Sequence, residues 1–270
     1  MRFAKWHGAG NDFLLFLPED GPDLATNLPK LAPRLCHRRM GLGADGVLLL
    51  EPQGEVIRLA YFNCDGSRAR FCANGTRCAA AFAWRRLGLS EVTLLTDFAP
   101  IPAQVSGTKV RLELPPPQPV VGWVELPVGP GAFRGFFLTV GVPHLVVPVG
   151  WEDFWQRPLE EAPTLRSHPD LGREGANVHF VRAVAGELWV RSFERGVEGE
   201  TLACGSGVVA AALVAVAEGW LPPPVAVRTA SQRVLEVTPR GGQPWGAVEL
   251  LGPAEPIAEG EVAAELLAGE

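Results

Sequence analysis

One stretch of the sequence reads Cys72-Ala73-Asn74-Gly75-Thr76-Arg77-Cys78-Ala79-Ala80-Ala81, and a similar stretch occurs in the second half of the chain. The counterpart reads Glu200-Thr201-Leu202-Ala203-Cys204-Gly205-Ser206-Gly207-Val208-Val209-Ala210-Ala211-Ala212. Each contains a cysteine, then a turn of small and polar residues that includes glycine, and then an alanine-rich run typical of a helix. The two stretches lie about one domain length apart. We therefore predict one supersecondary unit that is used twice, once in each half of the chain.

Short apolar runs rich in β-branched residues dominate the rest of the chain, and Gly, Pro, Asp or Asn bound them, so they are predicted as strands. The predicted strands are Phe13–Leu17, Val47–Leu50, Val56–Phe62, Lys109–Leu114, Phe136–Val140, Leu145–Val149, Asn177–Val181, Leu188–Phe193, Val225–Thr229, Val234–Thr238 and Ala247–Leu251. Helices are predicted at Leu28–Arg39, at Ala79–Leu87 before Gly88, and at Val208–Glu218 before Gly219. Strands dominate and do not alternate with helices, so the fold class is α+β rather than a doubly wound parallel sheet.

A proline run, Pro115-Pro116-Pro117-Gln118-Pro119, interrupts the chain near its middle. Consecutive prolines cannot continue a helix or a central strand, so this run is either a linker between halves or an edge loop within one domain. Its position favours the linker. We predict an N-terminal domain of residues 1–117, completed by the last segment at about residues 255–270, and a C-terminal domain of residues 118–254.

Composition narrows the function classes. The chain has 270 residues, of which 47% are hydrophobic, enough for one large core or two modest ones. A net charge of -6 argues against a nucleic-acid binder, which needs a basic face. No apolar run approaches the ~18–20 residues of a membrane span, and the start lacks the apolar segment of a signal peptide. We expect a soluble cytoplasmic protein that binds neither nucleic acid nor membrane.

The five cysteines are Cys36, Cys64, Cys72, Cys78 and Cys204. Their odd number, without a secretion signal, makes a disulfide framework improbable. There is no C-x-x-C pair, and the other spacings do not match common zinc sites, so no metal is expected. The default interpretation of each cysteine is a buried apolar filler.

Two of these cysteines have a feature that burial does not explain, because Cys72 and Cys204 each directly precede a predicted helix. The unpaired N–H groups and the dipole at a helix N-terminus favour negative charge, so they stabilise a thiolate and can hold a carboxylate. If the two halves face each other, one thiolate can remove an α-proton while the other thiol delivers a proton to the opposite face. The outcome is inversion of an α-carbon without a cofactor.

The sequence resembles the diaminopimelate epimerases, a pyridoxal-independent family that uses two cysteines. The matching motifs occur in order from residue 7 to residue 207 and are jointly specific. They are His7-Gly8-Ala9-Gly10-Asn11-Asp12-Phe13, Gly41-Leu42-Gly43-Ala44-Asp45, Asn63-x-Asp65-Gly66-Ser67, Cys72-x-Asn74-Gly75-x-Arg77-Cys78, Gly141-x-Pro143-His144, Asn177-Val178, Glu194-Arg195-Gly196 and Glu200-Thr201-x-Ala203-Cys204-Gly205-Ser206-Gly207.

The resemblance implies two similar domains, each with a mixed barrel-like sheet around a central helix, and an active site between them. It implies Cys72 and Cys204 as the acid/base pair, with His144 and Glu194 as further catalytic residues. The implied substrate-binding residues are Asn11, Asn63, Ala73, Asn74, Gly75, Asn177, Glu194, Arg195, Gly205 and Ser206. The resemblance also implies a small-molecule amino-acid substrate, no cofactor and a homodimer. Without it, His144 would be interpreted as a packed or capping histidine, and Glu194-Arg195 as a surface turn.

Three positions depart from the family pattern. Gly46 stands where the family usually has Gln, Val142 where it has Asn, and Ala73 where it has Gly. Gly46 and Val142 each lose a carboxamide that normally lies at the substrate, whereas Ala73 keeps its backbone N–H. A related two-thiol racemase for another amino acid is therefore a second hypothesis. A hydrolase or acyl transferase with a cysteine nucleophile and His144 would give the second cysteine no task, and a non-enzymatic binding protein would need neither thiol.

Overall fold

The computed structural model describes residues 1–129, 131–241 and 245–268, and the chain divides into two compact units. Unit 1 comprises residues 1–112 and 252–270, and unit 2 comprises residues 113–251. The proline run lies beside this division, between the strands Lys109–Leu114 and Val120–Val128. Strands predominate over helices in both units, which confirms the α+β class. No helix within the described residues is long and apolar enough to cross a membrane.

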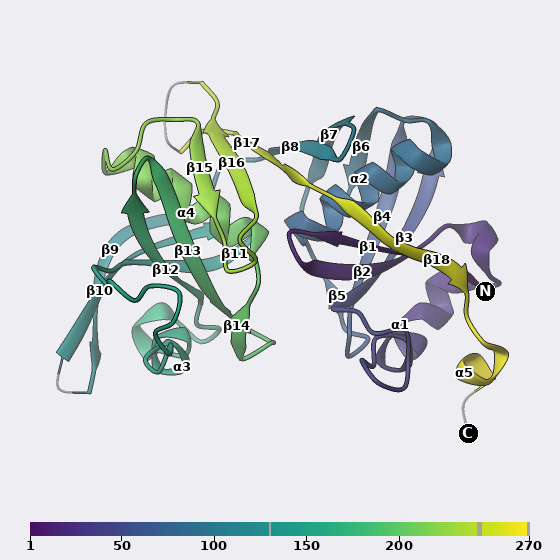
Figure 1. Cartoon of the computed structure of the whole chain (residues 1–270), viewed down its shortest axis with the longest axis horizontal. Helices are drawn as coiled ribbons and strands as arrows, with labels where there is room; N and C mark the ends of the chain where they lie inside the picture. Colours follow the sequence, from purple (N-terminus) through teal and green to yellow (C-terminus); the bar gives the residue numbers. More distant parts are fainter. Residues whose placement is uncertain (130, 242–244, 269–270) are drawn as a thin grey trace. The chain divides into compact units, whose positions relative to one another are not determined.

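Unit 1 is built on one mixed set of strand pairings, in the order β18–β1–β2–β3–β4–β6–β7–β8, with β5 added on β4. The pairs β2–β3 and β4–β6 are parallel and the others are antiparallel. The last strand of the chain, yellow in Figure 1, thus runs beside the first, in purple. The strands are β1 (Arg2–Gly8), β2 (Asn11–Phe16), β3 (Gly46–Gln53), β4 (Val56–Asn63), β5 (Arg68–Ala69), β6 (Glu91–Leu95), β7 (Pro100–Ser106), β8 (Lys109–Leu114) and β18 (Glu255–Glu261).

Unit 2 repeats this plan strand by strand, in the order β9–β10–β11–β12–β13–β15–β16–β17, with β14 added on β13. Its parallel pairs, β11–β12 and β13–β15, stand at the same places in the order. The repeat predicted from the cysteine segments is thus present in the strand pairings. The strands are β9 (Val120–Val128), β10 (Gly131–Val140), β11 (Val142–Pro148), β12 (Asn177–Val184), β13 (Glu187–Glu194), β14 (Gly199–Thr201), β15 (Val225–Arg228), β16 (Val234–Pro239) and β17 (Val248–Pro253).

One long helix packs against the strands of each unit. In unit 1 the helix α2 (Ala73–Leu87) contacts β1, β2 and β7, and in unit 2 the helix α4 (Gly205–Ala217) contacts β10, β11 and β16 (Figure 1). Nearly every residue of α4 is buried, which suits a helix that is apolar on all sides. The remaining helices are α1 (Leu24–Leu35), α3 (Ala162–Arg166), α5 (Ala264–Ala268) and the 3-10 turns η1 (Pro18–Asp20) and η2 (Pro169–Leu171).

The predicted helix Leu28–Arg39 was wrong at both ends, since α1 spans Leu24–Leu35. The chain turns back after this helix, and the Leu35 carbonyl accepts hydrogen bonds from the Leu42 and Gly43 N–H groups. A Cβ atom at Gly41 would lie 2.1 Å from the Arg34 carbonyl oxygen, so only glycine allows this turn.

The other two helices begin earlier than predicted, at Ala73 rather than Ala79 and at Gly205 rather than Val208. The apolar pattern begins only at the alanines and valines, whereas the N-cap cysteine sets the first turn. Every predicted strand is present. The sequence pattern missed β1, β6, β7, β9 and β18, together with the short strands β5 and β14. β18 has no buried residue and is defined by its pairing with β1, which periodicity does not reveal.

Candidate active site

Each of the two matched cysteines is the N-cap residue of the central helix of its unit. Cys72 has extended backbone before α2, and Cys204 has extended backbone before α4. Each thiol therefore lies at the N-terminus of a helix, where the first backbone N–H groups lack partners within the helix. The other three cysteines do not precede a helix: Cys36 is the C-cap residue of α1, Cys78 lies within α2, and Cys64 is exposed.

The Cys72 thiol lies among amide groups. The Gly75 N–H points at its Sγ at 3.5 Å, and its Sγ lies 3.7 Å from Asn11 Oδ1, which can accept the thiol proton. The Asn74 side chain donates to the same Asn11 oxygen at 3.1 Å. Four of the predicted residues, Asn11, Cys72, Asn74 and Gly75, thus come together at the start of α2.

Asp45, which no catalytic assignment included, fixes the orientation of Asn11. Its Oδ2 accepts a hydrogen bond from Asn11 Nδ2 at 2.6 Å, so Asn11 Oδ1 is left to face Cys72 and Asn74. Asp45 is itself held by Arg38 at 2.6 Å. Its position in the motif Gly41-Leu42-Gly43-Ala44-Asp45 was the available signal, but the sequence did not link it to Asn11.

Arg77 supports the same turn from inside unit 1. Its side chain is fully buried, donates to Asn74 Oδ1 at 2.7 Å, and reaches the Ala73 carbonyl at 3.4 Å and the Pro253 carbonyl at 3.4 Å. Burial lowers the pKa of this guanidinium to about 10, so it stays charged at neutral pH. Arg77 therefore holds the first turn of α2 in place through the Asn74 side chain and the Ala73 backbone carbonyl.

Local packing explains the glycine at position 46. A Cβ atom there would lie 2.5 Å from the Tyr61 ring and 2.8 Å from the Phe62 carbonyl oxygen, so no side chain fits. Tyr61 packs edge-to-face on Phe13, and it lines a small pocket together with Cys72. Position 46 therefore holds glycine because the Tyr61 ring, on the neighbouring strand β4, occupies the space next to it.

The Cys204 thiol has different neighbours. Glu194, at the end of β13, places its carboxylate in hydrogen-bond contact with the thiol, and Thr201 Oγ1 donates to Glu194. Ser206 Oγ lies 3.8 Å from Cys204 Sγ. Burial, followed by the Glu194 charge, raises the pKa of the Cys204 thiol well above its ordinary value, although the Gly207 N–H and the Ser206 hydroxyl oppose this shift. Cys204 is therefore protonated at rest.

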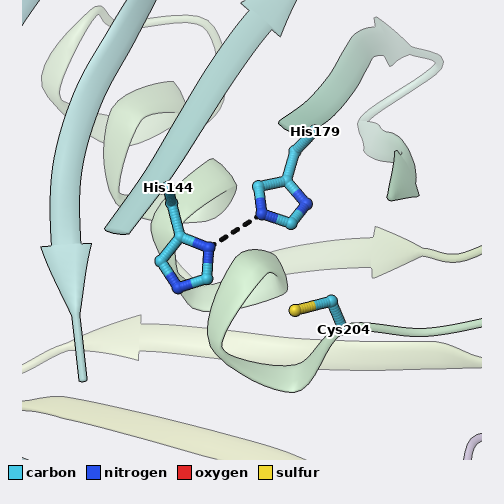
Figure 2. Close-up of side chains that lie close together, drawn as sticks. All are labelled: His144, His179 and Cys204. Atoms are coloured by element: carbon cyan, nitrogen blue, oxygen red, sulfur yellow. Dashed lines mark hydrogen bonds between the residues drawn. The ribbon is translucent and has the colours of Figure 1, made fainter. Parts of the chain in front are cut away.

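Two imidazoles lie beside Cys204 (Figure 2). His144 on β11 and His179 on β12 are both fully buried, and His144 Nδ1 is 2.8 Å from His179 Nε2. His179 Nδ1 is 2.9 Å from Ser192 Oγ on β13. Burial lowers the pKa of His144 to about 3 and that of His179 well below its ordinary value, so both rings are neutral.

The sequence motifs do not point to His179 and Ser192, although the two-residue spacing within the strands could have identified both. His179 follows Asn177 by two residues and Ser192 precedes Glu194 by two, so each shares a strand face with a predicted residue. The Gly207 site confirms that the His179 ring belongs here. A Cβ atom at Gly207 would lie 2.1–2.6 Å from three atoms of that ring, so the ring fits against the first turn of α4 only because residue 207 is glycine.

His144, His179 and Cys204 also form a group of donors that could hold a metal ion. One ligand atom from each lies within 4.8 Å of the other two, and all three residues are buried. The spacing of the cysteines alone predicts no metal. This set instead combines two strands and a helix end.

The remaining predicted residues have other partners. Asn177 stands opposite His144 in the parallel pair β11–β12, and its Oδ1 accepts the Arg195 N–H at 2.8 Å. The Arg195 guanidinium pairs with the exposed Glu174 at 2.7 Å. In unit 1, Asn63 donates to Ser67 Oγ at 2.9 Å. Gly205 opens α4 next to Ser206, and Val142 lies two residues before His144 on β11.

Comparison with known proteins adds an independent line of evidence. The family model for diaminopimelate epimerase matches residues 3–106 and 136–255. A diaminopimelate epimerase from Methanothrix thermoacetophila is 38% identical over 99% of this chain and 98% of its own length. The enzyme of that name from Aquifex aeolicus is 35% identical over 99% of each chain. That from Hydrogenobaculum sp. is 32% identical over 98% of this chain and all of its own.

Solved structures share the fold at much lower identity. A putative phenazine biosynthesis protein from Clostridium difficile matches with a TM-score of 0.74 and 12% identity over 97% of this chain and 99% of its own. A predicted epimerase from Pseudomonas aeruginosa matches with a TM-score of 0.69 and 16% identity over 96% and 98%. A hydroxyproline epimerase from Agrobacterium vitis, with bound trans-4-hydroxy-L-proline, matches with a TM-score of 0.67 and 16% identity over 98% and 92%.

Proposed function

This chain belongs to the diaminopimelate epimerase family, and we propose that it interconverts LL- and meso-diaminopimelate through Cys72 and Cys204. Family membership makes it an isomerase and associates it with lysine biosynthesis. The observation that supports the two-thiol mechanism is the repeated placement of a cysteine as the N-cap of the central helix. A second thiol in the equivalent position of the repeat has a role in a two-base reaction and none in a single-nucleophile reaction.

The proposed reaction begins with one cysteine as thiolate and the other as thiol. The thiolate removes the α-proton, the thiol gives its proton to the opposite face, and the reverse reaction exchanges the two roles. Glu194 takes the proton of Cys204 in this proposal, which the hydrogen bond between the two side chains supports. The Gly75 N–H stabilises a thiolate at Cys72, which its 3.5 Å contact with the sulfur supports. The mechanism requires that both sulfurs reach one α-carbon.

The substrate's reacting carboxylate needs hydrogen-bond donors that favour negative charge. We propose that the N–H groups of Ala73, Asn74, Gly75, Gly205 and Ser206 hold it, because N-terminal N–H groups and the helix dipole bind anions. This placement puts developing negative charge next to fixed dipoles, which lowers the barrier to α-proton removal.

The distal end of the substrate carries a second carboxylate and ammonium. We propose that Arg195 binds this carboxylate, because a guanidinium fork matches a carboxylate, and that Asn11, Asn63, Asn177 and Glu194 bind the amino and carboxyl groups of the substrate at both ends. Arg195 would exchange the exposed Glu174 carboxylate for that of the substrate, at little cost because exposed ion pairs contribute little.

Solvent deuterium entry tests the proposed reaction. The purified protein, kept reduced, is incubated in D2O with diaminopimelate and, in parallel, with proline and other amino acids. Deuterium at the α-carbon of diaminopimelate together with interconversion of its stereoisomers is the expected result. Exchange with another amino acid alone would contradict the substrate and support a related racemase. No exchange with any of them would contradict the reaction class.

We also propose a homodimer, as the family resemblance implies, and a location in the cytoplasm. Light scattering on a size-exclusion column tests the oligomeric state, with a mass near twice the 28.9 kDa chain as the expected result. Cell fractionation tests the location.

A further inference from the structure

The geometry points to an inhibitory site for a soft divalent cation, of which Zn²⁺ is the type, formed by His144, His179 and Cys204. The metal site stands on these three side chains, and only its inhibitory effect rests on the proposed function, in which Cys204 is an acid/base residue. The donor types are those that zinc prefers, namely imidazole nitrogen and thiolate sulfur.

The spacing of the donors is close to that of a zinc site. In a tetrahedral site the bond lengths place two imidazole nitrogens about 3.3 Å apart, and a nitrogen about 3.6 Å from a sulfur. His144 Nδ1 and His179 Nε2 are 2.8 Å apart, so they need to separate by about 0.5 Å. One donor atom of each residue already lies within 4.8 Å of the other two, so the sulfur–nitrogen distances exceed the tetrahedral value by at most about 1.2 Å (Figure 2).

The surroundings orient the donors as metal ligands are oriented elsewhere. His179 Nδ1 is held by Ser192 Oγ at 2.9 Å, which leaves its Nε2 directed at His144. Histidine ligands typically have such a partner on the nitrogen that faces away from the metal. Gly207 leaves room for the His179 ring at the start of α4.

The binding step balances in protons. The neutral imidazoles each keep one proton, carried on His144 Nε2 and on His179 Nδ1, while the proton between them moves to one of these outer nitrogens. Two nitrogen–metal bonds and one sulfur–metal bond form, and the Cys204 S–H bond breaks. Glu194 or solvent takes that proton. A metal-bound Cys204 can neither remove nor deliver a proton, so the metal inhibits and a chelator restores activity.

Cobalt is the probe for the site, because a thiolate bound to Co²⁺ gives a near-ultraviolet charge-transfer band and a tetrahedral site gives intense visible bands. The full-length protein is first treated with a chelator. It carries Cys64→Ser throughout, since the exposed Cys64 offers a competing thiol. We expect both sets of bands to saturate at one equivalent of Co²⁺ per chain.

Two variants and one control assign the bands. Cys204→Ser is expected to abolish the charge-transfer band, and His179→Gln to weaken Zn²⁺ binding about 100-fold or more, since even outer partners of a ligand contribute 10–100-fold. His168→Gln is the matched control, because His168 is a mostly buried histidine of the same unit that bonds to the Pro127 carbonyl at 3.1 Å and lies outside the group. It should bind cobalt like the parent protein.

Activity and stability complete the test. One equivalent of Zn²⁺ should stop turnover and raise the melting temperature of the parent, whereas Cys204→Ser should show no rise. A charge-transfer band that persists in Cys204→Ser, or no band at all, would overturn the site. A cobalt spectrum without inhibition by Zn²⁺ would overturn the inhibitory role. Because the spectra need no turnover, a failure of the proposed reaction would leave the metal result readable.

Discussion

Cys72 and Cys204 occupy the same place in two copies of one fold, yet their neighbours differ in kind. Cys72 faces a neutral carboxamide, Asn11, whereas Cys204 faces a carboxylate, Glu194, and two buried imidazoles. The repeat therefore gives both cysteines the same backbone position, in which the thiol of the N-cap residue lies at the helix N–H groups. The side chains then decide how each thiol exchanges its proton.

The helices behind the thiols differ in the same way. Five residues after Cys72 stands the buried Arg77, which holds the first turn through Asn74. Five residues after Cys204 stands Val209, a buried apolar side chain. The first turn of α2 is thus fixed by a polar network from within unit 1, and that of α4 by apolar packing and by the strands that carry His179 and Glu194.

The largest effect is expected on removing either thiol. Cys72→Ala and Cys204→Ala should each lower kcat about 10²–10⁴-fold, because each removes one of two acid/base groups. Measurement is by interconversion of the diaminopimelate stereoisomers. Cys64→Ala, at an exposed cysteine, should retain activity. Substantial turnover in one variant alone would show that its thiol is dispensable and that the repeat is not functional.

The charged neighbour of Cys204 should matter more than the neutral neighbour of Cys72. Glu194→Gln should lower kcat/KM about 100-fold, since a hydrogen bond to a charged group contributes up to about 3 kcal/mol. Asn11→Ala should lower it about fivefold, as expected for a neutral bond of about 1 kcal/mol. Glu194 raises the pKa of Cys204, so Glu194→Gln should also move the pH profile of that thiol to lower pH. Equal losses in the two variants would contradict the asymmetry.

The polar networks should also make the units respond differently to acid. The pKa of His144 is lowered to about 3 by burial, so the unfolded chain binds more protons between about pH 3 and its ordinary pKa of 6.5. Stability in unit 2 therefore falls as the pH drops below 6.5, by about 2 kcal/mol at pH 5 from this group alone. His179 acts in the same direction.

Unit 1 should lose stability only at lower pH. Burial raises the pKa of Asp12, but Arg38 and Lys5 together lower it by more than burial raises it, so the pKa lies below its ordinary value. This contribution is present above about pH 4 and is lost as the pH falls through the folded-state pKa. Hydrogen exchange is measured in urea, with chelator present, as the pH is lowered from 6.5 to 4. Peptides of unit 2 should lose protection before those of unit 1. Loss in unit 1 first would contradict these directions.

The sequence was sufficient for the fold class, the repeat and the position of both thiols, because these follow from local patterns of apolar residues, glycines and cysteines. It was insufficient where a contact joins distant segments. The Gly46–Tyr61 contact, the Asp45–Asn11 bond and the His144–His179 pair each connect different strands or loops. β18 shows the same limit for the fold, since an exposed segment becomes a strand only through its partner β1.

The smallest effect tests whether orientation, rather than charge, governs Cys72. Asp45→Asn can turn an amide N–H toward Asn11 and so allow Asn11 to rotate, which would present Nδ2 instead of Oδ1 to the thiol. The loss of one preferred orientation should lower kcat/KM about three- to tenfold, in the range of a single hydrogen bond. Asp65→Asn is the matched control, because Asp65 is another carboxylate of unit 1 that accepts hydrogen bonds, but from Ser67 rather than Asn11. If Asp45→Asn costs far more than tenfold, Asp45 acts through its charge, and the contrast with Glu194 at Cys204 would narrow. If it costs nothing, the Asn11 carboxamide holds its orientation through Asn74 alone, and the Arg77 network becomes the main support of the first thiol.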